Sequence, residues 1–142
     1  MWFQFMDMKE KYQEILNEVL DEIDTALKDS KGIVSHQRRL AFCLSLGTVN
    51  LLEAYLDETG VLKSGAKINH LWLKKKSENV KQLIQAQITS PAGNLEKINR
   101  ILEVAYKIEI ERNKLAYGKN VSEAELKEKI NLFLDLKKEL GK

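Results

Sequence analysis

The residues best suited to chemistry are concentrated between positions 109 and 118, in the segment Glu-Ile-Glu-Arg-Asn-Lys-Leu-Ala-Tyr-Gly. An apolar stripe at helical spacing leads into this segment and consists of Leu95, Ile98, Ile101, Ala105 and Ile108. The next position on the stripe should be apolar if the helix buries this face, but it is Arg112. Burial of an unpaired guanidinium costs free energy. The pattern therefore predicts either a cleft beside Arg112 or an acidic residue opposite it.

This segment resembles the signature of the HEPN superfamily (higher eukaryotes and prokaryotes nucleotide-binding). That signature is an arginine, often followed by asparagine, with four to six residues before a histidine. Here Arg112 and Asn113 match its start, and Tyr117 stands where the histidine would be. A weaker likeness in the helix pattern extends from about Tyr12 to Leu140. The resemblance implies a helical bundle whose site assembles at a homodimer interface and cleaves RNA without a metal.

The resemblance also implies a role for each of the three motif residues. Arg112 would hold a phosphate, because a guanidinium can donate two parallel hydrogen bonds. Asn113 would orient that arginine, and Tyr117 would replace the histidine that moves protons. A phenol is a poor general base at neutral pH, and no histidine follows Arg112 in the chain. We therefore expect binding rather than cleavage.

Three functions remain open at this stage. The preferred one is a HEPN-like module that binds RNA or a nucleotide, or that partners a small nucleotidyltransferase as toxin–antitoxin pairs do, without catalysis. The second is a metal-independent ribonuclease with a composite dimer site. The third is a helical interaction module with no nucleotide role, in which Arg112 is structural. RNA degradation distinguishes the ribonuclease, and co-purification with a nucleotidyltransferase distinguishes the partner module from the third function.

The elements that must position this segment are all predicted to be helices. Amphipathic stripes separated by turn residues predict helices over about 7–28, 35–58, 69–88 (with a break near Ser77), 94–117 and 122–140. Ser122 and Glu125 form a capping box for the last of these, and Gly118 ends the one before it. The prediction is an all-α, up-and-down bundle of about five helices, forming a single domain over residues 1–142.

The helix over 35–58 is apolar on most sides, so it is predicted to be the central helix. Its glycine, Gly47, either permits close helix approach or is simply tolerated. Its few polar residues include a line through Asn50, Glu53 and Asp57. Two interpretations of this line fit the sequence. It is the water-facing edge of the helix, or Glu53 faces Arg112 across a cleft and belongs to the site.

The most basic stretch lies between residues 61 and 81, which contain six lysines and one glutamate. Lys74, Lys75 and Lys76 are consecutive, with His70 and Trp72 beside them. Such a group could hold an RNA backbone and stack a base. The plainer interpretation is a solvated lysine face, with Trp72 in the core.

Composition excludes several other classes. The net charge of +2 does not by itself imply nucleic acid, and one cysteine, Cys43, excludes an internal disulfide framework. We expect a cytoplasmic protein with no membrane span and no cofactor, and the two histidines lack a zinc spacing. Near the N-terminus, Trp2, Phe3 and Phe5 are expected to cover the bundle end or to join a dimer contact.

Overall fold

The computed structural model describes residues 7–142, and its regular secondary structure is helical apart from one isolated bridge. The α-helices are α1 (Met8–Lys28), α2 (Gln37–Glu58), α3 (Ser77–Gln85), α4 (Ile98–Glu109), α5 (Arg112–Tyr117) and α6 (Glu123–Glu139). Three short 3₁₀-helices join them, η1 (Ile33–His36), η2 (His70–Lys74) and η3 (Ala92–Asn94). The expected role of the aromatic residues at positions 2, 3 and 5 lies outside the described residues.

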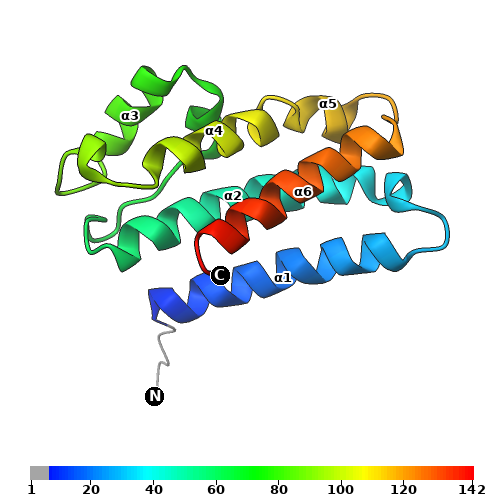
Figure 1. The fold of residues 1–142 in the computed structure, drawn as a ribbon, viewed down its shortest axis with the longest axis horizontal. Coiled ribbons are helices and arrows are strands. Elements are labelled where there is room, and N and C mark those ends of the chain that lie inside the picture. Colours follow the sequence, from blue (N-terminus) through cyan, green and yellow to red (C-terminus); the bar gives the residue numbers. More distant parts are fainter. Residues whose placement is uncertain (1–6) are drawn as a thin grey trace, which may run out of the picture.

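The long elements run up and down in succession, with α3 beside one end of α4 (Figure 1). Because α4 and α5 are two parts of one predicted helix, the molecule is an all-α bundle of about five helices, and this prediction is confirmed. The predicted cap at Ser122 forms, and Asp7 caps α1 in the same way. The Asp7 side chain accepts from Glu10 N at 2.8 Å, and the Ser122 side chain accepts from Glu125 N at 3.2 Å.

Helix α2 is the central element, as its composition predicts, because α1, α4, α5 and α6 all pack against it. Within residues 7–142, Ile33–Glu58 is the segment that is long and apolar enough to cross a membrane by length and composition alone. Of its most apolar window, 67% is buried inside the bundle, which is the behaviour of a core helix in a soluble protein.

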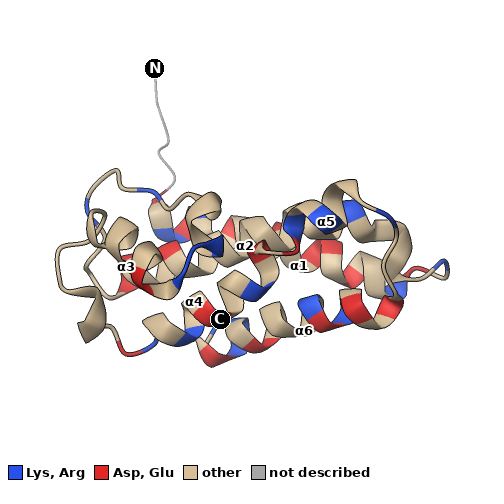
Figure 2. Ribbon diagram, turned by 90° about the horizontal axis from the view of Figure 1, so that it is seen from above, with Lys and Arg blue, Asp and Glu red and all other residues tan. Residues whose placement is uncertain are grey.

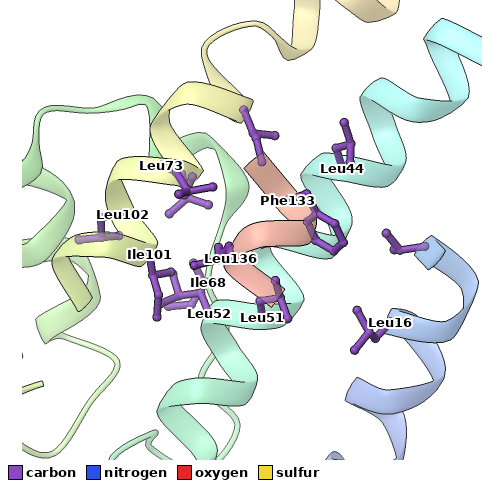
Figure 3. Packing of buried hydrophobic residues seen from close by; sticks show 14 of the residues in the cluster. Leu16, Leu44, Leu51, Leu52, Ile68, Leu73, Ile101, Leu102, Phe133 and Leu136 are labelled. Carbon is purple, nitrogen blue, oxygen red and sulfur yellow. The ribbon is translucent and has the colours of Figure 1, made fainter. Parts of the chain in front are cut away.

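The core is built where α6 lies across α2. Figure 3 shows Phe133 and Leu136 of α6 among leucines of α2, with Leu16 contributed by α1. A Cβ placed on Gly47 would lie 2.7 Å from Phe133 Cε1. Gly47 therefore permits close approach of the two helices, which was one of the two interpretations of this glycine.

The predicted helix over residues 69–88 is instead a short 3₁₀-helix followed by a shorter α-helix. Asn69 does act as a cap, since its side chain accepts from Leu71 N, but it caps the 3₁₀-helix η2 instead of a long α-helix. The break near Ser77 is confirmed, and α3 ends at Gln85 rather than near Ile88. The reason is a backbone pairing, in which Lys63 N donates to Gln87 O and Thr89 N donates to Val61 O. Residues 87–89 pair with residues 61–63 and so cannot continue the helix.

The predicted helix 94–117 begins later, at Ile98, and is interrupted at Ile110 and Glu111. After the interruption, α5 packs against α2 and buries Leu115 and Ala116. Gly118 ends α5 as predicted, but its φ of −90° is not left-handed. Glycine is needed there because a Cβ would lie 2.5 Å from the carbonyl oxygen of Lys114.

Candidate functional site

Arg112 is the first residue of α5, and its guanidinium lies over an aromatic ring of α2. The Arg112 Cζ atom is 4.9 Å from the centroid of the Phe42 ring, which is cation–π distance. The same ring forms a T-shaped pair with the Tyr117 ring, with centroids 6.1 Å apart and planes at 75°. Arg112 Nη1 also donates to Asn113 Oδ1 at 3.2 Å. The three residues of the predicted motif therefore meet on one surface around Phe42.

The acidic residue beside Arg112 is Glu109, at the C-terminal end of α4. Its side chain is buried, and its two oxygens have separate partners. Ser45 Oγ donates to Oε2 at 2.8 Å, and His70 Nδ1 lies 2.5 Å from Oε1. Arg112 Nε is 4.0 Å from the same Oε1. The buried carboxylate of Glu109 thus lies next to a serine, a histidine and an arginine from three other elements.

The interpretation that paired Glu53 with Arg112 is wrong. Glu53 Oε1 accepts instead from the backbone N–H of Ile68 at 2.8 Å, which fixes the loop before η2. The physical reason is position along the helix. Phe42, whose ring lies under the Arg112 guanidinium, comes eleven residues before Glu53 on α2. At the helical rise per residue, this spacing separates the two positions by about 16 Å along the helix axis. The water-facing interpretation is also wrong in part, because Asn50 is buried and donates to Tyr12 O.

An open pocket of about 390 Å³ adjoins this cluster. Its lining combines apolar and polar groups from α2, from the loop at η2 and from α5, namely Phe42, Ser45, Leu46, Val49, Ile68, Asn69, His70 and Arg112. Of the predicted site residues, the structure places Arg112 in this lining. Asn113 and Tyr117 lie on the adjoining surface, and Glu53 does not take part.

The consecutive lysines lie elsewhere. Lys75 and Lys76 border a different pocket of about 470 Å³, together with Tyr106 and Lys107. Lys74 ends η2, and Trp72 is half-buried against the core. Trp72 is therefore in the packing position that the plainer interpretation gave it, and His70 is separated from the lysines by the length of η2.

The segment that follows α5 is held in place by a buried glutamine of α2. Gln37 Nε2 donates to the carbonyls of Leu115 and Lys119, both at 3.1 Å, and its Oε1 accepts from Val121 N at 2.9 Å. Arg38 adds a hydrogen bond to Gly118 O at 3.0 Å. These contacts fix the turn next to Tyr117. Figure 2 shows that α5 itself carries basic residues.

Sequence reasoning missed the cluster of Glu109, His70 and Ser45. One signal was present, because Glu109 follows Ala105 by one helical turn on the apolar side of its helix, where an acid needs a partner. Nothing local could indicate that His70 is that partner. Within residues 7–142, no three histidine, cysteine or acidic side chains are grouped to hold a metal ion.

Comparison with known proteins adds no relative. No family model, no curated protein and no solved structure matches this chain.

Proposed function

We propose that this chain is a HEPN-like domain that binds single-stranded RNA or a nucleotide, with Arg112 holding a phosphate. One observation carries the proposal, which is that the Arg112 guanidinium is set over Phe42 at the rim of an open pocket. A planar guanidinium fixed on an aromatic face is well placed to donate two parallel hydrogen bonds to phosphate oxygens.

The charge of Arg112 is only partly neutralised by its protein neighbours. Its nearest acid, Glu109, is 4.0 Å away and is already bonded to Ser45 and His70. In the described part of the chain, Arg112 Nε is buried and has no hydrogen-bond partner. A buried donor without a partner costs about 1–3 kcal/mol, so the protein holds Arg112 with part of its hydrogen-bonding capacity unused.

Exposed rings beside Arg112 supply faces on which bases could stack. Phe42 is half-exposed, and Tyr117 has 73% of its surface exposed. Base stacking on aromatic side chains contributes about 1–3 kcal/mol per base and tolerates any sequence. The apolar surface beside these rings suits a second copy of the chain, so we propose a homodimer in which the rings line a cleft shared by two such sites. We also propose that the protein is cytoplasmic, because a chain with a single cysteine, Cys43, fits a reducing compartment.

The test is binding of a short single-stranded 2′-O-methyl RNA, followed by fluorescence anisotropy. Arg112→Gln should weaken binding by roughly tenfold or more, since a charge-assisted hydrogen bond contributes about 1.5–3 kcal/mol. Lys127→Gln, on the exposed surface of α6, removes the same charge and should change binding little. Equal losses in the two variants would mean that the RNA recognises net charge and not this site.

A further inference from the structure

A second open pocket lies between α3 and α4, and it shares no lining residue with the pocket at Arg112. We propose that this second pocket binds a carboxylate with an apolar tail, a ligand of the medium-chain fatty acid class. Two features point to such a ligand, an apolar floor and a pair of lysines that have no acidic partner. Because the two pockets are separate, this binding is independent of RNA binding at Arg112.

The floor of the pocket is apolar and comes from both helices. Val80 of α3 and Leu102 of α4 line the pocket and are themselves buried. Tyr106, one helical turn after Leu102, adds an exposed ring. The volume of about 470 Å³ is in the range of small-molecule sites. An alkyl chain that enters the pocket leaves water for an apolar surface, so each buried CH₂ group favours binding.

The charged groups that line the pocket are mainly lysines. Lys75 and Lys76 lie in the short segment between η2 and α3, and both are exposed. Within residues 7–142, none of the ion pairs includes either of them. The acid in the lining, Glu103, already has two partners, since its Oε1 is 3.3 Å from Lys107 Nζ and 3.5 Å from Arg100 Nη1. Two positive charges therefore remain for a ligand, and a carboxylate is the complementary group.

A pocket of similar size on α6 shows that volume alone does not select an anion. That pocket measures about 480 Å³, and its charged lining residues are Lys127, Glu128 and Asp135. The two acids there outnumber the lysine, so a carboxylate would be disfavoured. RNA suits the pocket between α3 and α4 less well than a fatty acid does. A phosphate backbone would use the lysines alone and leave the apolar floor unfilled.

The experiment titrates the full chain, labelled with ¹⁵N, with octanoate, 1-octanol or butyrate and follows the amide signals by NMR. Octanoate should shift the amides of residues 75–80 and 102–107, which surround the pocket. 1-Octanol lacks the charge and should bind roughly threefold or more weakly. From butyrate to octanoate, each further CH₂ group that enters the pocket should tighten binding by roughly threefold to fourfold.

Variants separate the role of the lysines from that of the apolar floor. Lys75→Gln combined with Lys76→Gln should weaken octanoate binding by roughly threefold or more and leave 1-octanol binding unchanged. Lys127→Gln combined with Lys138→Gln is the matched control, because it removes two exposed charges from α6 and should change neither ligand. Tyr106→Ser, which removes an apolar wall, should weaken both ligands to the same extent.

Three outcomes would overturn the proposal. The first is that octanoate leaves the amides of residues 75–80 and 102–107 unshifted. The second is equal binding of octanoate and 1-octanol, which would mean that the lysines have no part in the site. The third is displacement of octanoate by the 2′-O-methyl RNA, which would assign the lysines to nucleic acid. RNA binding that depends on Arg112 is measured separately, so either proposal can fail without the other.

Discussion

The ring of Phe133 on α6 lies so close to the backbone of Gly47 on α2 that a Cβ there would be 2.7 Å from Cε1 and 2.8 Å from Cζ. Gly47→Ala should therefore destabilise the protein by about 1–3 kcal/mol, the usual cost of overpacking a core. The gain in helix propensity, about 1 kcal/mol, offsets only part of this. Urea unfolding followed by circular dichroism measures the difference.

Gly93→Ala is the matched control for this prediction. A Cβ on Gly93 meets no atom within 4 Å, and its φ is not positive. This substitution should leave the unfolding midpoint nearly unchanged. Equal stability of the two variants would show that Phe133 moves aside at little cost.

The fold was largely predictable because its signals are local. The cap at Ser122 and the stripe of α1 each act within a few residues, and both appear in the structure. What could not be predicted depends on partners distant in sequence. The early end of α3 results from pairing between residues 87–89 and 61–63, which no local pattern reveals.

The candidate site was predictable to a similar extent. The stripe before Arg112 indicated an uncompensated charge, and an acid does lie beside it. The choice of acid was wrong, because Glu53 and Glu109 occupy equally plausible places on their helices and only tertiary packing decides between them. His70 gave no local signal at all, since its partner lies 39 residues away on another element.

A pair of double-mutant cycles tests which acid belongs to the cluster. For Glu53→Gln with Arg112→Lys, the coupling free energy of unfolding should lie within about 0.5 kcal/mol of zero, as for residues without shared partners. For Glu109→Gln with His70→Gln, it should reach about 0.5–3 kcal/mol, as for residues in direct contact. A large coupling in the first cycle, or none in the second, would contradict the pairing observed here.

Cys43 should be chemically inert in the folded protein. Burial, with Glu22 nearby as a second cause, raises the pKa of the Cys43 thiol from 9.0 to about 12. Its Sγ also donates to Val19 O at 3.5 Å. A thiol reagent at about pH 8 should therefore react slowly with the native chain and quickly once urea has unfolded it. Similar rates in both states would contradict the burial.

The same pKa shift has a defined effect on stability. A raised pKa means that the folded state favours the neutral thiol, so this contribution is complete below the unfolded value of 9.0 and is lost as pH rises toward 12. The free energy of unfolding should fall over that window in the wild type. It should fall less steeply in Cys43→Ala, which removes the group.

The face around Arg112 should be the contact between two copies of the chain. Phe42, Leu46 and Tyr117 are exposed there, and aromatic residues beside an arginine are enriched in interface cores. In a twofold dimer through this face, the two Arg112 pockets would adjoin. We expect sedimentation at micromolar concentration to give a dimer, and Tyr117→Asp to dissociate it, because a charge would enter an apolar contact.

Tyr106→Asp is the matched control, since Tyr106 is also an exposed tyrosine but lies beside the other pocket. A monomeric wild type would contradict the predicted contact. A dimer that only the Tyr106→Asp variant dissociates would place the contact elsewhere.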